Sequence, residues 1–343
     1  MVNTVDFSGR PFHFIGIGGI GMSALAYVLA KRQLPVSGSD LRSTHITQRL
    51  QGVGAHIFKD QIGTNLEVFQ PKHQIATEAV PALANGIVEP PKCRQFSEED
   101  NSQFLRETLP QVICSTAIAH NNSEYAAAKE KGCPIFHRSD VLAALIQEYQ
   151  SIAVAGTHGK TTTSSLMGYV LLKAGIDPTI IVGGEVDAWE GNARIGAKNG
   201  YLVAEADESD GSLTKHFPNI GVVTNIELDH PDHYQTLDDV VKTFQIFETQ
   251  CDILIASLDC EIVSTQLTPH ITYSLDASKG ADYTVKNLLS DHKGTTADVW
   301  EKGNYLGQMR LTIPGNHNVS NALAAIAVGR KLGIDFEVIA DAL

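Results

Sequence analysis

The sequence predicts an α/β protein with two domains, each built on a parallel sheet. Three observations predict this fold class. Apolar runs of strand length alternate with helix-like stretches along the chain. The length of 343 residues exceeds that of a usual single domain. Two glycine-rich turns each follow an apolar run and precede a helix-like stretch, which is the place where α/β sheets bind phosphate groups.

The first glycine-rich turn opens the chain. Residues 12–40 predict a strand, a turn, a helix and a second strand, in the order "FHFIGI", "GGIG", "MSALAYVLAKRQ" and "PVSGSD". Gly16, Gly18 and Gly21 match G-x-G-x-x-G, and Asp40 lies 19 residues beyond Gly21, near the spacing at which an acidic side chain meets a ribose hydroxyl. These residues predict a βαβ nucleotide unit, so the first domain is expected to be Rossmann-like.

The alternation continues to residue 150. Strands are predicted for "GAHIF", "QVICSTAI" and "PIFHR", and helices for "NNSEYAAAKEKG" and "SDVLAALIQEYQ". Prolines, acids and weak periodicity mark residues 81–104 as a surface insertion. Because a new apolar strand, "SIAVAG", starts at Ser151, the domains are predicted to span 1–150 and 151–343.

The second glycine-rich turn is "AGTHGKTTT", residues 155–163. Its glycines let backbone N–H groups close on an anion, Lys160 can reach terminal phosphates, and the hydroxyl of Thr161 can hold Mg²⁺. Val154 stands where the full P-loop pattern has its first glycine, so Gly156 leads a tighter loop. The strand before it and the helix after it still predict triphosphate binding. His158 is expected either to contact phosphate or to pack within the loop.

The rest of the second domain predicts a doubly wound sheet. A helix, "TTSSLMGYVLLKAG", is followed by the strand-like runs "GYLVAEAD", "NIGVVTNIELDH" and "DILIASL". Ligands bind at the carboxyl ends of parallel strands, and acidic residues end two of these runs. The second domain is therefore expected to be of the P-loop type, with its site at these strand ends.

The acidic run "EADESD" contains Glu205, Asp207, Glu208 and Asp210. Alone, such a run is typical of a solvated turn. In a domain with a phosphate loop, a carboxylate facing Thr161 can serve Mg²⁺, which takes a few hard oxygen ligands together with phosphate oxygens. Glu205, the first acid after the strand, is the preferred candidate, and Asp207, Glu208 and Asp229 come next.

The run "NIELDHPDHY" contains an H-x-x-H spacing, formed by His230 and His233. This spacing could indicate zinc, but no third strong ligand lies nearby, so an acidic Mg²⁺ site is preferred. A hydrogen-bonded structural role for His230 stays open.

Charge and cysteine usage exclude several protein classes. Thirteen net negative charges without a lysine- or arginine-rich run argue against nucleic acid or a membrane as partner. Five cysteines without a C-x-x-C suggest neither a disulfide framework nor a thiolate zinc site, and fit a reducing cytoplasm. Residues 12–30 are apolar, but four glycines in the first half of the run predict a turn and not a membrane span.

Eight ordered motifs resemble those of the Mur ligases, over residues 12–343. They are "FIGIGGIGMSALA", "VSGSD", "CSTAI", "AGTHGKTTT", "VGGEVDAWEGNARIG", "VAEADESDGS", "VTNIELDHPDHY" and "PGNHNVSNALAA". The resemblance implies that the first turn holds the diphosphate of a UDP-sugar and the second holds ATP. It implies ATP- and Mg²⁺-dependent ligation of L-alanine to the carboxylate of UDP-N-acetylmuramate through an acyl phosphate, in cytoplasmic peptidoglycan precursor synthesis.

The resemblance also implies roles for individual residues. The UDP-sugar would contact Gly18, Gly19, Ile20, Gly21, Met22, Ser23, Ser39, Asp40, Ser115, Thr116, Ala117, Asn192 and Arg194. ATP would contact Gly156, Thr157, His158, Gly159, Lys160, Thr161, Thr162, His317, Asn318 and Asn321. Lys160, Glu205 and His230 would be catalytic, with Thr161, Glu205 and His230 as metal ligands.

Three departures from the family pattern are visible. Leu213 replaces the usual aromatic residue, which is a mild packing change, and the 81–104 insertion avoids every motif. The third concerns activity, because the sequence stops at "LGIDFEVIADAL", in what resembles the helix before the family's third domain. The chain is therefore expected to bind its substrates, with turnover in doubt. The alternatives are an NAD-dependent oxidoreductase, which leaves "GTHGKT" unexplained, and a non-catalytic UDP-sugar-binding module.

Overall fold

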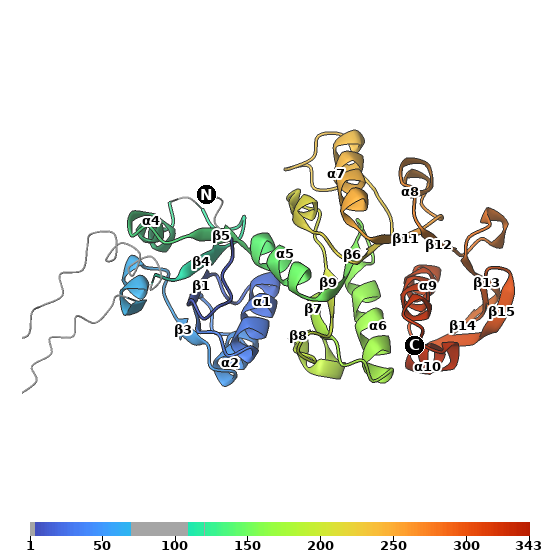
Figure 1. The fold of residues 1–343 in the computed structure, drawn as a ribbon, viewed down its shortest axis with the longest axis horizontal. Coiled ribbons are helices and arrows are strands. Elements are labelled where there is room, and N and C mark those ends of the chain that lie inside the picture. Colours follow the sequence, from blue (N-terminus) through green and yellow to red (C-terminus); the bar gives the residue numbers. More distant parts are fainter. Residues whose placement is uncertain (1–3, 70–108, 120) are drawn as a thin grey trace, which may run out of the picture.

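The computed structural model describes residues 4–69, 109–119 and 121–343 (Figure 1). The predicted insertion at 81–104 lies outside them. Within the described residues, no helix is both long enough and apolar enough to cross a membrane. The apolar run at 12–30 is divided between a strand, a turn and a helix, as predicted.

Sheet A holds the first turn. It contains five parallel strands in the order β3-β2-β1-β4-β5, which confirms the small parallel sheet predicted. The order reverses between β1 and β4, and such a reversal opens a crevice at the carboxyl ends of the strands. The strands are β1 (Phe12–Ile15), β2 (Val36–Ser39), β3 (His56–Phe58), β4 (Gln111–Cys114) and β5 (Ile135–His137), with helices α1 (Ile20–Lys31), α2 (His45–Gly52), α4 (Ser123–Glu130) and α5 (Arg138–Glu148) and the 3₁₀ segment η1 (Gly63–Phe69).

Sheet B holds the second turn and has ten strands in the described residues, in the order β15-β14-β13-β12-β11-β10-β6-β9-β7-β8. The strands from β7 to β13 in this order run parallel, while β8, β14 and β15 are antiparallel at the two edges. The strands are β6 (Gln150–Ala155), β7 (Thr179–Val186), β8 (Gly191–Arg194), β9 (Tyr201–Glu205), β10 (Ile220–Val223), β11 (Ile253–Ser257), β12 (Ile271–Ser274), β13 (Tyr283–Asp291), β14 (Gly294–Glu301) and β15 (Asn304–Leu311). The doubly wound prediction is thus confirmed for the centre of the sheet, and the antiparallel edges were not predicted.

Helices cover both faces of sheet B (Figure 1). They are α6 (Lys160–Lys173), α9 (Asn316–Lys331) and α10 (Phe336–Ala342) on one face, and α7 (Leu237–Gln250) and α8 (Glu261–Gln266) on the other, with η2 (Asp187–Trp189), η3 (Ser212–Lys215) and η4 (Ala277–Lys279) in the connections. The strand β6 is buried on both sides, because Ile152 and Val154 pack with α6 and α9 while Ala153 and Ala155 join the core under α7. This two-sided burial explains its continuous apolar run.

The two sheets meet along a packed seam. Helix α5 ends at Glu148, and β6 begins sheet B at Gln150. The core that starts on β1 continues across this seam to α7. Across the seam, Arg49 donates to the backbone oxygens of Trp189 and Ala193, at 3.2 and 2.9 Å. The two sheets are thereby held against each other.

Candidate active site

The first glycine turn joins β1 to α1. The backbone N–H groups of Gly16 and Ile17 donate to the oxygen of Ser39, at 2.8 and 3.0 Å, and α1 starts without a side-chain cap. The N–H of Gly18 donates to Asp40 Oδ2 at 2.9 Å. A Cβ at position 18 would lie 2.7 Å from that oxygen, so any other residue there would have to displace the Asp40 carboxylate. Asp40, predicted near the uridine end, lies against the turn.

A buried polar network lies next to this turn and contacts it through Ser39. His13 and Glu124 are both fully buried, and His13 Nε2 lies 2.8 Å from Glu124 Oε1. The other ring nitrogen, Nδ1, lies 2.8 Å from Ser37 Oγ. Asn65 Nδ2 donates to Glu124 at 2.8 Å, and the Ser39 hydroxyl also donates to Glu124. Sequence reasoning missed this network, although a histidine inside the apolar run "FHFI" was its visible signal.

Ser39 lies beneath the first turn. Its side chain is completely buried, its hydroxyl donates to Glu124, and its carbonyl accepts from the N–H groups of the turn. Ser39 therefore helps to build the turn, and its expected contact with the UDP-sugar stays a prediction.

A cleft of about 370 Å³ opens between the first turn and the second domain. Its walls contain three groups of the expected residues, namely the turn itself, the segment after β4, and Glu205 of the second domain. The residues on these walls are Gly19, Ile20, Gly21, Met22, Leu25, Ser115, Thr116, Arg138, Leu142, Ile181, Val182, Gly183, Glu205 and Asp207. The cleft thus joins the predicted UDP-sugar residues to the predicted metal ligand.

Other predicted UDP-sugar residues lie away from these walls. Asn192 is buried, and its Nδ2 donates to Ser23 Oγ at 2.9 Å and to the Ile20 oxygen at 2.5 Å. Arg194 donates to the Pro178 oxygen at 2.7 Å and pairs with Asp177. In this structure the side chains of Asn192 and Arg194 tie backbone segments together, and their expected substrate contacts stay predictions. Gly18 and Ala117 also lie outside the cleft lining.

The second glycine turn joins β6 to α6. Gly156 has φ 139° and Gly159 has φ 83°, and a Cβ on Gly156 would overlap the Thr224 hydroxyl. The N–H groups of Thr157 and His158 donate to the backbone oxygen and the side chain of Asn225, at 3.1 and 2.8 Å. This anchoring fixes the loop at the start of α6, where backbone N–H groups favour an anion.

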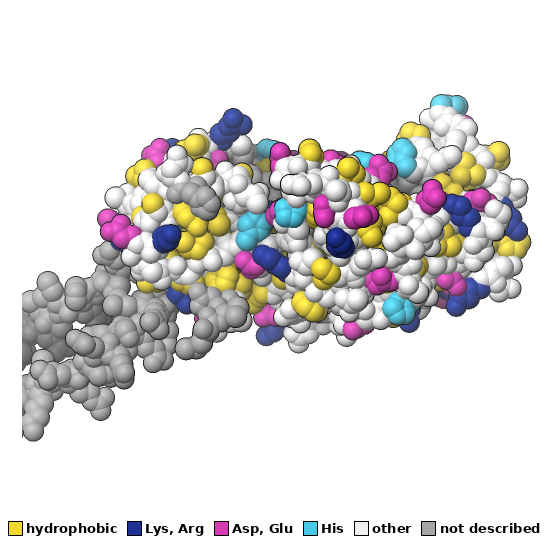
Figure 2. Space-filling model, turned by 90° about the horizontal axis from the view of Figure 1, so that it is seen from above, with side chains coloured by type: hydrophobic (Ala, Val, Ile, Leu, Met, Phe, Trp, Pro, Cys, Tyr) yellow, Lys and Arg dark blue, Asp and Glu magenta, His cyan; other side chains and the backbone are white. Residues whose placement is uncertain are grey.

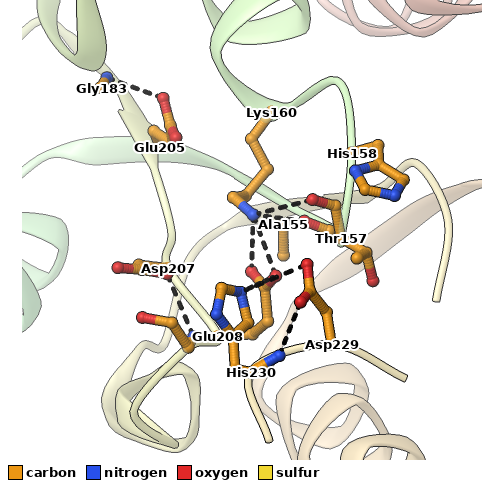
Figure 3. Close-up of polar contacts among 12 residues, drawn as sticks. Ala155, Thr157, His158, Lys160, Gly183, Glu205, Asp207, Glu208, Asp229 and His230 are labelled. Carbon is orange, nitrogen blue, oxygen red and sulfur yellow. Dashed lines mark hydrogen bonds and ion pairs between the residues drawn. The ribbon is translucent and has the colours of Figure 1, made fainter. Parts of the chain in front are cut away.

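Lys160 is the first residue of α6, and its ammonium group points back into the loop (Figure 3). It donates to the Gly156 oxygen at 2.6 Å and lies 3.0 and 2.9 Å from the two carboxylate oxygens of Glu208. Glu208 is 1% exposed. Burial raises the pKa of the Glu208 carboxyl above its ordinary value, and the charge of Lys160 opposes that shift.

The predicted metal ligands fall into two groups. The Thr161 hydroxyl donates to Glu205 Oε2 at 2.8 Å, and the Gly183 N–H donates to the same oxygen at 2.7 Å. His230 lies instead near Glu208, with 3.6 Å between Nε2 and Oε1, and its φ of 56° is left-handed. Figure 3 shows Glu205 directed toward Gly183 and away from His230. Thr161 and Glu205 therefore meet as predicted, whereas His230 lies apart from them.

These donors fit Mg²⁺ better than zinc. Thr161 and Glu205 offer one hydroxyl and one carboxylate, and Mg²⁺ uses one or two carboxylates together with phosphate oxygens and water. Across the described residues, no group of three or more His, Cys, Asp or Glu side chains could hold a metal by itself. The H-x-x-H at 230–233 thus lacks the further ligands that zinc needs.

The acidic run alternates between two faces. Glu205 and Glu208 face the phosphate loop, while Asp207 and Asp210 face the first domain. Arg138 donates to Asp207 Oδ2 at 2.6 Å, and His137 Nε2 lies 3.5 Å from Asp210 Oδ2. Burial acts to raise the pKa of Asp207, but hydrogen bonds from Ser209 and Arg138 outweigh it, so the pKa is lowered. Asp207, a reserve metal candidate, is thus engaged across the seam.

A second cavity, of about 630 Å³, lies on the other side of the phosphate loop. Four of the expected ATP residues line it: His158, Gly159, His317 and Asn321. Asn321 Oδ1 accepts from Thr163 at 3.1 Å, which ties α9 to α6. Asn318 lies beside this wall and donates to the Pro314 oxygen at 2.7 Å. Thr162, on α6, is half-buried.

The outer surface carries side chains of both charges. On the face seen in Figure 2, the Lys and Arg side chains of the described residues are scattered among Asp and Glu and form no continuous basic patch. Anions must therefore be bound locally, at the two turns, and not by a general surface field.

Comparisons with known proteins identify the family. Residues 11–150 match the family model described as Mur ligase family, catalytic domain, and residues 154–329 match the Mur ligase middle domain. UDP-N-acetylmuramate–L-alanine ligase of Crocosphaera subtropica is 80% identical over 345 residues, covering 100% of this chain and 67% of that protein. The corresponding Synechocystis protein is 60% identical, covering 100% of this chain and 68% of that protein.

Solved structures agree with these matches. The crystal structure of UDP-N-acetylmuramate-alanine ligase from Thermotoga maritima has a TM-score of 0.77 and 28% identity, covering 97% of this chain and 67% of that one. A structure from Neisseria meningitides at 21% identity has a TM-score of 0.78 and supports the fold alone. The chain spans about two thirds of the length of its curated relatives. With both glycine turns, the cleft between them and these matches in agreement, the chain belongs to the Mur ligase family.

Proposed function

We propose that this protein carries out ATP-dependent ligation of L-alanine to the carboxylate of UDP-N-acetylmuramate, in peptidoglycan precursor synthesis. One structural observation carries the proposal. Glu205 lines the cleft of the first turn. It also accepts a hydrogen bond from the hydroxyl of Thr161, which follows the second glycine turn. A carboxylate bound in the first domain and a phosphate bound in the second would therefore meet at one residue. The identity to named alanine ligases, 80% in the Crocosphaera protein, supports the choice of substrates.

The reaction joins two anions before it forms an amide. An oxygen of the muramyl carboxylate attacks the terminal phosphorus of ATP, the bond to ADP breaks, and an acyl phosphate forms. The amine of L-alanine then attacks the acyl carbon, phosphate leaves, and the amine loses a proton. The first step needs positive charge where two anions approach, which is the dominant requirement in phosphoryl transfer.

The residues of the phosphate loop fit this requirement. Lys160 offers a fixed ammonium group, held by Glu208 and by the loop oxygens. Thr161 and Glu205 are the residues that would hold Mg²⁺, which when bound supplies further positive charge at the reacting phosphate. His230 is proposed as a second metal contact, although its ring lies nearer to Glu208. His317 and Asn321 would border the nucleotide base.

The first turn serves binding and not transfer. Its backbone donors and the residues Ser115 and Thr116 line the cleft proposed for the UDP-sugar. The four described cysteines are free thiols, which agrees with the reducing cytoplasm proposed for this reaction.

The test is a two-substrate assay. ADP release should require UDP-N-acetylmuramate, and amide formation, followed by mass spectrometry, should further require L-alanine. Tight binding of NADH without any effect of UDP-N-acetylmuramate would favour an oxidoreductase and contradict the proposal. Sugar-nucleotide binding without ATP consumption would favour a non-catalytic binding module.

A further inference from the structure

Among the described residues, Arg138 is the one positively charged side chain on the walls of the first-turn cleft. It lies in none of the motifs that indicated the site. Its Nη2 donates to Asp207 Oδ2 at 2.6 Å. Its Nη1 lies over the first turn, 3.1 Å from where a Cβ of Gly21 would stand. The guanidinium group therefore bridges the glycine turn and the acidic loop of the second domain.

The charges of the cleft pose a problem for the proposed substrate. A UDP-sugar acid carries a diphosphate and a carboxylate, yet Glu205 and Asp207 on the same walls are acidic. The first turn contains no lysine, and its Gly18 N–H is already engaged by Asp40. Anions at short range in a partly enclosed site repel each other strongly. A counter-charge has to come from another element, and Arg138 is placed to supply it.

We propose that Arg138 is the cationic contact of the substrate diphosphate, and that Asp207 orients its guanidinium group for this contact. The assignment rests on the proposed function. The planar fork of arginine can bond one anion on each edge, with Asp207 on Nη2 and phosphate oxygens toward Nη1. Asp207 stands two residues from Glu205 in the same loop. The diphosphate contact is thereby linked to the loop that carries the proposed metal ligand.

The competing explanation is that Arg138 only clips the two domains together. The molecule offers a matched control for this role. Lys215 of the second domain pairs with Asp140 of α5 at 2.7 Å, across the same seam. Neither residue lines the cleft. Loss of the Lys215 pair therefore reports what an interdomain ion pair contributes without contact to substrate.

The experiment is calorimetric binding of UDP-N-acetylmuramate and of UDP-N-acetylglucosamine, which has the diphosphate but lacks the carboxylate. Arg138→Met should weaken both by about tenfold or more, since charge-assisted hydrogen bonds to phosphate are lost. Arg138→Lys should restore part of the affinity. Asp207→Asn should bind at least as tightly as wild type, because the amide oxygen can still accept the orienting hydrogen bond from Arg138 while a negative charge facing the substrate is removed. Lys215→Met should bind as wild type does. Thermal unfolding checks that each variant is folded.

Four outcomes would overturn the assignment. If Arg138→Met and Asp207→Asn weakened sugar-nucleotide binding equally, the Arg138–Asp207 pair would only hold the two domains together. Weakening of UDP-N-acetylmuramate alone would move the contact from the diphosphate to the carboxylate. Wild-type affinity in Arg138→Met would remove the residue from binding while the proposed function stands. If wild type itself bound neither sugar nucleotide, the proposed substrate would fall, and this assignment with it.

Discussion

The two glycine turns use the same backbone device for different tasks. Each follows the carboxyl end of a buried strand, and each leads into a helix whose glycine cap makes no side-chain hydrogen bond. Beside the first turn lie the carboxylate of Asp40 and, at the edge, the guanidinium of Arg138. Inside the second lie Lys160 and the Thr161–Glu205 pair.

This difference separates a turn that binds a phosphate group from a turn that can also catalyse phosphoryl transfer. Glycine turns and helix starts supply backbone donors, which are sufficient to bind a phosphate group. Phosphoryl transfer also needs fixed positive charge and metal ligands at the reacting phosphorus. Within the residues that the structure describes, the lysine and the Thr161–Glu205 pair belong to the second turn, whereas the first turn has a single guanidinium group at its edge. The first turn is accordingly interpreted as the site that positions a substrate.

The largest expected effect tests that separation. Lys160→Ala should lower the ATP-dependent rate by about 10² to 10³-fold, because a fixed charge at the transferring phosphate is worth about 3 to 4 kcal/mol. UDP-sugar binding, measured by calorimetry, should stay near wild type. Lys173→Ala, at the other end of α6, is the matched control. An unchanged rate in Lys160→Ala would remove this residue from the mechanism.

The next effect concerns the support of the first turn. Glu124→Gln should cost about 2 kcal/mol of stability, since a buried carboxylate that accepts three hydrogen bonds loses its charge beside His13. Urea unfolding measures this loss. Glu130→Gln, on the exposed face of the same helix, should change stability little. Equal midpoints for the two variants would show that the buried network does not support the first domain.

A smaller effect is expected at the metal ligand. Glu205→Gln should lower the rate about tenfold and raise the Mg²⁺ concentration needed, because an amide oxygen is a weaker ligand than a carboxylate. Added Mg²⁺ should recover part of the rate. The control is Glu337→Gln on the exposed side of α10. A Mg²⁺ titration identical to that of wild type would place the metal site elsewhere, with Glu208 and Asp229 tested next.

Much of the fold could be predicted because its signals are local. Glycine turns between apolar runs located β1, β6 and the helices after them to within a few residues. The antiparallel strands β14 and β15 were missed, since their sequences alternate only in part. A register shift between Val299 and Trp300 further interrupts their pairing. Of the two, only β15 is at the edge of the sheet, where it is less buried and so has less hydrophobic signal, whereas β14 is paired on both sides and more buried.

The residues of the candidate site also divide into those that a local motif indicates and those that it does not. The position of Lys160 at the start of α6 and the contact between Thr161 and Glu205 could be predicted, because each residue stands at a strand end or in the turn after one, within a recognisable motif. Ser39 and Asn192 stand in motifs too, but their side chains point into the protein, which no motif records. Glu124 and Arg138 were missed since their partners lie 111 and 69 positions away in the chain. Such pairings arise from the topology of the sheets and leave no local pattern.

The smallest expected effect compares one buried histidine in each domain. His13 has a partner at each ring nitrogen, whereas neither nitrogen of the fully buried His216 has a hydrogen-bond partner in the described part of the chain. Burial lowers the pKa of His216 to about 4. The folded protein therefore keeps this ring neutral, while the unfolded chain binds a proton below about pH 6.5.

The free energy of unfolding is therefore unaffected by the protonation of His216 above pH 6.5. It decreases as the pH falls from 6.5 toward 4, because only the unfolded chain binds the proton. Linkage gives a loss of about 1 kcal/mol between pH 6.5 and 5.5. Urea unfolding of wild type and His216→Phe at these two values measures it, and the variant should lose about 1 kcal/mol less. Asp207, whose pKa is lowered, adds acid sensitivity only below about pH 4, so it does not blur the comparison. If both proteins lost the same free energy over this range, His216 would have to be protonated in the fold, and a hydrogen-bonding partner for its ring would have to exist.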